Sequence, residues 1–335
     1  MNVHPEKRKG DVAMKGGMTI GRLEFLTGVT GLLAVPSVFA AESRARKDEW
    51  RKVSLTVGAE RPFKALHVSD THLTVLTEAE KAESAWRRKY YEGRFARSFG
   101  PAEEALRRTV ERARTEGLTL LHTGDLMDCP SDGNIEIVRR MLPAGSLVAA
   151  AGNHETCSRY FRGNDDSAAA LKGERERSAS RLKSCWPNDP RWFVREVNGV
   201  RFVAFDDTDY QIAPDIRANL ERTFADGKPV VLLCHVPFYE PTLMKCSLAR
   251  WKSPSLLGVP DAVSSAPERT FRFPEEQRPT ALTLDTLAWL KGRSNLKAVL
   301  CGHLHIPWQG EFAPGIPMLV AEANFTGGGY EIAFE

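Results

Sequence analysis

The chain has 335 residues, of which 42% are hydrophobic and 27% are charged. This composition is typical of one large globular domain, or of a core domain with insertions. The formal net charge is +3, and without residues 1–41 there are 41 basic against 40 acidic residues. A uniformly polybasic surface is therefore excluded, and the sequence carries no strong nucleic-acid signal.

The first 41 residues predict a targeting segment. Basic residues up to Arg22 precede the apolar, uncharged stretch Phe25–Ala41, in which small residues around Ala40 supply a cleavage-like pattern. Arg22-Leu23 is similar to a twin-arginine signal in which Leu23 replaces the second Arg, so twin-arginine and Sec routes both stay open. The apolar stretch is short for a membrane span of about 20 residues. We expect an exported, periplasmic or secreted protein with no stable span after cleavage, and the alternative is an uncleaved anchor.

Six cysteines follow this segment, and no C-x-x-C spacing occurs among them. An even count in an exported chain permits disulfides without giving their pairing. A bond between Cys129 and Cys157 is one hypothesis. Cys234 and Cys301 lie in apolar runs and are predicted to be buried free thiols. The missing C-x-x-C spacing argues against a thiolate zinc site.

Residues 50–335 predict a single domain in which strands and helices alternate. Asn198-Gly199 between two apolar runs predicts a hairpin. The polar stretches 156–190 and 239–280 are interpreted as insertions that shape access to a site. The expected strands are Lys52–Val57, Phe63–Ser69, Leu118–His122, Ser146–Ala151, Trp192–Val197, Val200–Phe205, Lys228–Cys234, Leu296–Cys301, Ile316–Ala321 and Tyr330–Phe334. The expected helices are Glu78–Arg97, Pro101–Thr115, Ile135–Met141, Pro214–Phe224 and Leu282–Leu290.

Potential metal ligands follow five of the expected strands. Open α/β sheets place their ligands at the carboxyl ends of strands, and carboxylate and imidazole donors suit Mn, Fe and Zn ions. One histidine at a strand end is more often structural, so the prediction depends on five such clusters in one chain. Asp125 is central, since its two oxygens could hold two ions about 3.5–4 Å apart. The candidate ligands are Asp70, His72, Asp125, Asn153, His235, His303 and His305.

The five clusters occur in the order D-x-H, G-D-x-x-D, G-N-H-E, H-x-P and G-H-x-H, and this order resembles the calcineurin-like metallophosphoesterases. The matching segments are Asp70–His72, Gly124–Asp128, Gly152–Glu155, His235–Pro237 and Gly302–His305. The resemblance implies an α/β fold of two packed mixed β-sheets flanked by helices, a four-layer sandwich with the site at one edge. It also implies two divalent or trivalent metal ions bridged by Asp125. Asp70, His72 and His305 would hold the first ion, and Asn153, His235 and His303 the second.

Two further residues receive catalytic roles from the resemblance. His154 would stabilise the transition state and protonate the leaving oxygen, because histidine is the commonest general acid near neutral pH. Asp128 would orient His154. The alternatives are a structural loop histidine for His154 and a loop cap for Asp128. Glu155 is interpreted as a structural hydrogen-bonding residue.

The expected function is metal-dependent phosphoester hydrolysis by a metal-activated water. Cys129-Pro130 stands where protein serine/threonine phosphatases have Arg-Gly, and His72 is a histidine that purple acid phosphatases lack. We expect a phosphodiesterase or phosphomonoesterase that acts on a small substrate in the exported compartment. One alternative is a metal-binding scaffold or binding protein without hydrolytic activity. Another is a nuclease of the same superfamily, although the near-neutral charge argues against binding of duplex DNA.

Overall fold

The computed structural model describes residues 49–95, 100–265, 271 and 273–335. The predicted targeting segment, residues 1–41, lies outside the described residues and stays a prediction. Within the described ranges, no helix is both long enough and apolar enough to cross a membrane.

The first β-sheet has five strands, and the three that precede metal-ligand motifs lie side by side. These three, β2, β3 and β4, are parallel neighbours, and most of their residues are buried. Parallel strands are covered on both faces, which is why they occur in the sequence as continuous apolar runs. In sheet order the strands are β1 (Glu49–Leu55), β11 (Gly328–Phe334), β2 (Phe63–Val68), β3 (Thr119–Thr123) and β4 (Leu147–Ala150).

The second sheet has six strands and an antiparallel pair at each edge. The four inner strands are parallel, and β5 and β9 pair with their neighbours in antiparallel fashion. Positive φ angles of 47° at Asn198 and 80° at Gly199 form the tight turn between β5 and β6, so the predicted hairpin is confirmed. In sheet order the strands are β5 (Trp192–Val197), β6 (Val200–Phe205), β7 (Val230–Leu233), β8 (Leu296–Cys301), β10 (Ile316–Val320) and β9 (Trp308–Ala313).

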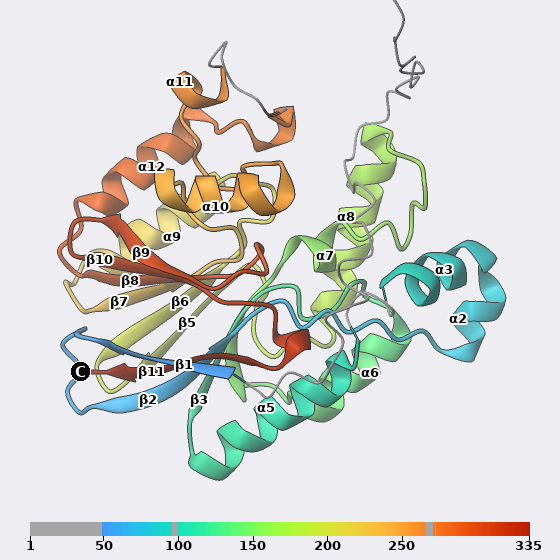
Figure 1. The fold of residues 1–335 in the computed structure, drawn as a ribbon, viewed down its shortest axis with the longest axis horizontal. Coiled ribbons are helices and arrows are strands. Elements are labelled where there is room, and N and C mark those ends of the chain that lie inside the picture. Colours follow the sequence, from blue (N-terminus) through green and yellow to red (C-terminus); the bar gives the residue numbers. More distant parts are fainter. Residues whose placement is uncertain (1–48, 96–99, 266–270, 272) are drawn as a thin grey trace, which may run out of the picture. The chain divides into compact units, whose positions relative to one another are not determined.

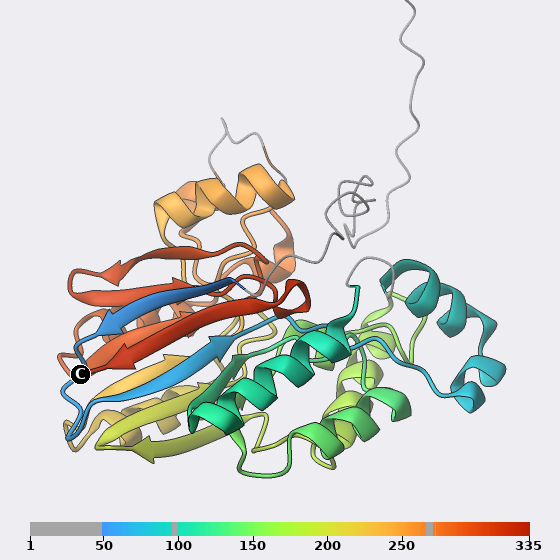
Figure 2. The ribbon, with the colours of Figure 1, turned by 60° about the horizontal axis from the view of Figure 1, so that its bottom comes forward.

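Three apolar cores separate four layers. The central core lies between the sheets and contains Leu121 from the first and Phe202 from the second. A core on the outer face of the first sheet includes side chains of α5 (Ala102–Glu116) and α6 (Asp132–Met141). The core on the outer face of the second sheet includes α9 (Pro214–Phe224), α10 (Pro241–Trp251) and α12 (Ala281–Lys291). Figures 1 and 2 show these helices on either side of the paired sheets, so the predicted two-sheet α/β fold is confirmed.

The remaining elements show where the sequence predictions were wrong. One helix was expected over Glu78–Arg97, but the structure has two short α-helices followed by a π-helix. Ser84 has an extended backbone that ends the first helix, and its side chain caps the second by accepting from Arg87 N. The stretch 156–190, expected to be loosely helical, contains α8 (Ala168–Leu182). The stretch 239–280, interpreted as a loop insertion, contains α10, and β9 has no counterpart among the expected strands. The smaller elements are α2 (Glu78–Glu83), α3 (Ala85–Tyr90), the π-helix η1 (Tyr91–Phe95), α7 (Asn153–Thr156), α8 (Ala168–Leu182), α11 (Asp261–Ser264), and the 3₁₀ turns η2 (Glu275–Gln277) and η3 (Asn324–Thr326).

All six cysteines are free thiols. The hypothesis of a disulfide between Cys129 and Cys157 is therefore wrong for this structure. Cys234 and Cys301 are fully buried, as their apolar surroundings predicted.

Candidate metal centre

The seven candidate ligands lie on loops that follow β2, β3, β4, β7 and β8. Asn153 is the first residue of α7, which begins three residues after β4, and the other ligands lie two or four residues beyond their strands. Because parallel strands direct their carboxyl ends to a common edge, the fold brings together side chains that are far apart in the sequence.

The backbone of these loops is strained where the candidate ligands lie. Five of the seven have left-handed φ angles, which are Asp70 (54°), His72 (54°), Asp125 (52°), His303 (70°) and His305 (54°). Such a conformation costs about 1–3 kcal/mol per residue and persists only where the surrounding structure enforces it. Hydrogen bonds of 2.9 Å from Asp70 N to Gly124 O and from His72 N to Asp125 O hold two of the loops together. Strain concentrated at the ligands favours a functional origin for these loop conformations.

Two motif glycines are required by close packing of the loops. A Cβ atom at Gly302 would lie 2.6 Å from Asp70 Oδ2, and one at Gly152 would lie 2.9 Å from Asp125 Cγ. Real Cβ atoms do not approach other atoms so closely, so a side chain at either position would displace a candidate ligand. The glycines of G-N-H-E and G-H-x-H therefore allow the loops to approach the two carboxylates.

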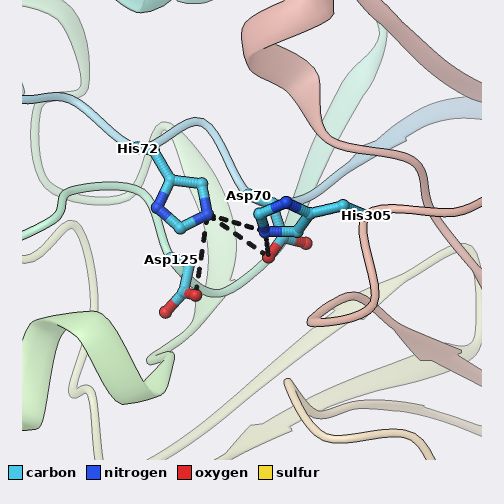
Figure 3. Close-up of side chains that lie close together, drawn as sticks. All are labelled: Asp70, His72, Asp125 and His305. Atoms are coloured by element: carbon cyan, nitrogen blue, oxygen red, sulfur yellow. Dashed lines mark hydrogen bonds and ion pairs between the residues drawn. The ribbon is translucent and has the colours of Figure 1, made fainter. Parts of the chain in front are cut away.

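The first group of candidate ligands consists of Asp70, His72, Asp125 and His305, whose side chains point toward one another in Figure 3. The Nε2 atoms of His72 and His305 are 2.9 Å apart. Asp70 Oδ1 lies 3.1 Å from His305 Nε2 and 3.7 Å from His72 Nε2. Two imidazoles and a carboxylate thus converge on one point beside Asp125.

The second group lies on the other side of Asp125. His235 Nε2 is 3.1 Å from His303 Nδ1 and 3.1 Å from Asn153 Oδ1. It is also 3.3 Å from Asp125 Oδ2. Two imidazoles, an amide oxygen and the Asp125 carboxylate therefore form a second possible ligand set.

Asp125 belongs to both groups through a single oxygen. Its Oδ2 atom lies 3.8 Å from His72 Nε2 and 3.3 Å from His235 Nε2. Its Oδ1 atom instead accepts a hydrogen bond of 2.9 Å from the backbone N–H of His154. The sequence indicated that the two oxygens of Asp125 could hold two ions, and in the structure the Oδ2 atom alone faces both groups.

The donor atoms fit a pair of cations. His235 Nδ1 lies 2.8 Å from the carbonyl oxygen of Thr123, which can only accept, so Nδ1 carries a proton and Nε2 is the ring nitrogen available to a metal ion. Burial lowers the pKa of His235, but the Asp125 and Asp70 carboxylates raise it to about 10. The carboxylates therefore favour a positive charge at this position, and a bound metal ion would supply that charge in place of a proton.

Asp70 provides a second observation in favour of a cation. Its buried Oδ1 atom has no hydrogen bond of good geometry in the described part of the chain, and its close polar neighbours are the Nε2 atoms of His305 and His72, which are themselves candidate ligands. A buried carboxylate oxygen without a donor is costly unless a cation compensates it. The mixed nitrogen and oxygen donor set suits Mn, Fe or Zn.

His154 and Asp128 lie beside the first group. His154 Nδ1 is 2.9 Å from Asp128 Oδ1, while His154 Nε2 is 4.0 Å from Asp125 Oδ2. His154 belongs to neither group that contains Asp125. With His72 and Asp128 it forms a third cluster of possible ligand atoms, and its side chain is 19% exposed. Asp128 Oδ1 also accepts from His72 Nδ1 at 2.6 Å, so one buried carboxylate contacts both a candidate metal ligand and the candidate acid.

Two buried carboxylates hold the loops without facing the metal groups. Glu155 accepts hydrogen bonds from the backbone N–H groups of Asp125, Met127 and Gly152, which agrees with the structural role expected for it. Asp207 accepts from the N–H groups of His235 and Val236, both at 3.0 Å. Asp207 was not among the predicted site residues, although it follows the end of β6 by two residues and is therefore another polar residue at a strand end.

Tyr210 is a second residue that the sequence analysis missed. Its hydroxyl lies 2.7 Å from His303 Nε2, which leaves His303 Nδ1 directed at His235. Outer partners of this kind set the tautomer and orientation of a metal-binding imidazole. No motif could have revealed Tyr210, because it approaches the site from a loop with no ligand spacing.

These features define a candidate dinuclear centre on a two-sheet α/β fold. A family model described as "Calcineurin-like phosphoesterase" matches residues 63–307, and the chain belongs to this family. It is therefore a metallophosphoesterase, an enzyme that hydrolyses phosphoric esters. The recognition of this family from the sequence motifs is confirmed.

Three solved structures illustrate which proteins this chain is similar to. A dimetal phosphatase from Danio rerio has 14% identity and a TM-score of 0.43, with 79% of this chain and 88% of that chain covered. A putative 5'-nucleotidase from Staphylococcus aureus has 13% identity and a TM-score of 0.41; the match covers 79% of this chain and 49% of that protein, about half its length. The phosphopantetheinyl hydrolase of Mycobacterium tuberculosis has 14% identity and a TM-score of 0.39, with coverage of 78% and 90%. A comparison with curated protein sequences gave no match.

Proposed function

We propose that this metallophosphoesterase is an exported phosphodiesterase or phosphomonoesterase that acts on a small phosphoester with two Mn, Fe or Zn ions. The observation that carries the proposal is Asp125 Oδ2, which faces a histidine pair on each side with His154 beside it. The near-neutral charge without residues 1–41 favours a small substrate over duplex DNA.

The ligand residues would act by holding two cations at a fixed separation. Asp70, His72 and His305 would hold the first ion, Asn153, His235 and His303 the second, and Asp125 would bridge them. When bound, such ions act as Lewis acids toward the phosphoryl group and make water nucleophilic near neutral pH. The strained loops, Glu155 and Tyr210 would keep the donors in place before the substrate arrives, which lowers the reorganisation needed during the reaction.

His154 would be the general acid for the leaving oxygen. Its contact with Asp128 occupies Nδ1 and leaves Nε2 on the side of the metal groups, where a bound phosphoester would lie. Burial lowers the pKa of His154, but the Asp125 charge and the hydrogen bond to Asp128 raise it above its ordinary value. The protonated form, which donates to a leaving group, is therefore favoured.

Hydrolysis of two chromogenic esters tests this function. Protein that has been stripped with a chelator and reloaded with Mn²⁺ should hydrolyse bis-p-nitrophenyl phosphate, p-nitrophenyl phosphate, or both, and the stripped protein should not. The ratio of the two rates separates diesterase from monoesterase activity. A panel of cyclic nucleotides, nucleotides, glycerophosphodiesters and phosphorylated sugars would then define the substrate class. Two bound ions without turnover of any ester would instead support a metal-binding protein that lacks hydrolytic activity.

Export predicts a processed N-terminus. If Phe25–Ala41 is a signal region, the mature protein should begin near Ala41 or Glu42. Intact-mass measurement of protein from its native host, with the periplasmic and cytoplasmic fractions analysed separately, checks this expectation. Retention of Met1 on soluble cytoplasmic protein would contradict the proposed export.

A further inference from the structure

His122 is a buried histidine that the proposed reaction does not use. It is the last residue but one of β3, its exposed fraction is 0%, and it lies three residues before Asp125. It does not belong to any of the candidate metal-ligand groups in the described residues. Its two ring nitrogens instead contact two of the loops that carry candidate ligands.

The hydrogen bonds of His122 define its tautomer. The backbone N–H of Gly124 donates to His122 Nδ1 at 3.2 Å, and since an amide N–H can only donate, Nδ1 is unprotonated. The ring proton therefore lies on Nε2, which is 3.0 Å from Thr71 Oγ1. Thr71 separates Asp70 from His72, and Gly124 directly precedes Asp125, so one imidazole joins the two loops.

The far end of this chain of hydrogen bonds is fixed as well. Thr71 Oγ1 donates to Asn324 Oδ1 at 3.2 Å. The Asn324 amide cannot be reversed without loss, because its Nδ2 donates to the carbonyl oxygen of Gly328 at 3.1 Å and lies 3.1 Å from Thr109 Oγ1. Each hydrogen bond in the series from Gly124 through His122 and Thr71 to Asn324 therefore has a fixed donor and a fixed acceptor. The side chains of His122, Thr71 and Asn324 are fully buried, so water cannot replace a lost hydrogen-bond partner at low cost.

We infer that His122 is a positioning residue for the first metal ion, because it holds the backbone that carries Asp70, His72 and Asp125 in its strained conformation. These three residues have left-handed φ angles between 52° and 54°. The loops of Asn153, His235 and His303 make no contact with His122 among the described hydrogen bonds. Loss of the imidazole should therefore weaken the first site more than the second. This inference rests on the proposed two-metal function.

Three variants separate the two hydrogen bonds of the ring. His122→Phe keeps a ring of similar size and removes both bonds. His122→Asn keeps an acceptor near the Nδ1 position, and His122→Gln keeps a donor near the Nε2 position. His67→Phe is the matched control, since His67 is equally buried on the adjacent strand and bonds to Thr123 Oγ1 but not to a ligand loop. Circular dichroism and thermal unfolding would confirm that each variant is folded.

Two variants that each retain one metal site show which ion the loss of the His122 imidazole affects. With His303→Ala the protein should keep the first site, and with His305→Ala it should keep the second. We expect His122→Phe to weaken Mn²⁺ binding by about 10–100-fold in the His303→Ala background, as other outer-shell losses do. Binding in the His305→Ala background should change little. The Asn and Gln variants should recover part of the loss, and the Mn²⁺ electron paramagnetic resonance spectrum of His122→Phe should change from that of a coupled pair to that of an isolated ion.

Isothermal titration with Mn²⁺ decides between the outcomes. Equal affinities for His122→Phe and wild type in the His303→Ala background would overturn the inference and leave the proposed function intact. Equal losses in both backgrounds, or the same loss in His67→Phe, would also overturn it, since the effect would then be general. A wild-type protein that binds fewer than two ions would overturn the proposed function and this inference with it.

Discussion

Asp125→Asn is expected to weaken the binding of both metal ions and not just one. Purified wild-type protein should bind about two divalent ions, since two ligand groups share one carboxylate. The variant should bind both weakly, and its activity should fall by more than the roughly 100-fold that loss of an outer-shell partner costs. Elemental analysis and Mn²⁺ titration of the two proteins measure the difference.

The orientation of the new amide explains why neither site survives. Asp125 Oδ1 accepts from the backbone N–H of His154, and Oδ2 faces both metal groups. In the variant, an amide oxygen that keeps the bond to His154 turns the NH₂ group toward both ions. In the reversed orientation the NH₂ group points at the backbone N–H of His154, so that two donors face each other. Both orientations also lose the negative charge.

A matched control separates this effect from the general consequence of an Asp-to-Asn change. Asp285 lies on an exposed position of α12, so Asp285→Asn should keep two ions and full activity. If Asp125→Asn retained one ion at wild-type affinity, Asp125 would belong to a single site. If it retained two, the bridging assignment would be wrong.

The strands and the ligand loops could be predicted from the sequence because the burial of parallel strands produces the sequence signals of both. A buried parallel strand occurs as an apolar run, and the polar residue that ends the run lies at the sheet edge where ligands gather. Phe63–Ser69 followed by Asp70, and Leu296–Cys301 followed by Gly302-His303, show the pattern clearly. The edge strand β9 lacks this pattern of an apolar run followed by a polar residue, because Gly310 interrupts a half-exposed segment.

Helix α10 was not predicted because its signals were interpreted as those of a loop. Pro241 lies in the first helical turn, where its missing N–H is tolerated, and Glu240 caps the helix by accepting from Thr242 N and Leu243 N at 2.7 Å. The helix extends to the metal centre, since Trp251 Nε1 donates to Leu304 O at 2.7 Å between His303 and His305. Contacts of this kind depend on tertiary packing and have no local sequence signal.

Asp128 also has a contact that the sequence could not reveal. The family resemblance implies its approach to His154, and the structure adds the 2.6 Å contact with His72 Nδ1. Burial raises the pKa of Asp128, and His72 and His154 lower it below its usual value. Asp128 is therefore expected to affect both the first metal ion and the acid, and tests of the acid must be made at saturating metal.

His154→Ala is expected to reduce the hydrolysis of alkyl phosphoesters by about 10²–10⁴-fold, the usual cost of losing a positioned general acid. Metal content should be unchanged, because the bond to Asp125 Oδ1 comes from the His154 backbone N–H, which alanine retains. The loss should be much smaller for p-nitrophenyl esters, whose leaving group needs little protonation. Rates on a series of esters with leaving groups of graded pKa, measured at saturating Mn²⁺, check this expectation.

Asp128→Asn tests whether the two residues act as a unit. An amide in place of the carboxylate removes the charge that favours a protonated His154, so the variant should show the same dependence on leaving group with a smaller loss. It should also need more Mn²⁺ for saturation, because His72 Nδ1 loses its charged partner, whereas His154→Ala should not. In the double variant at saturating Mn²⁺, Asp128→Asn should add little to the loss from His154→Ala, since a carboxylate that acts through an imidazole has no further effect once that imidazole is gone. Full additivity would show that Asp128 acts independently of His154, and an equal loss on good and poor leaving groups would show that His154 does not donate a proton to the leaving oxygen.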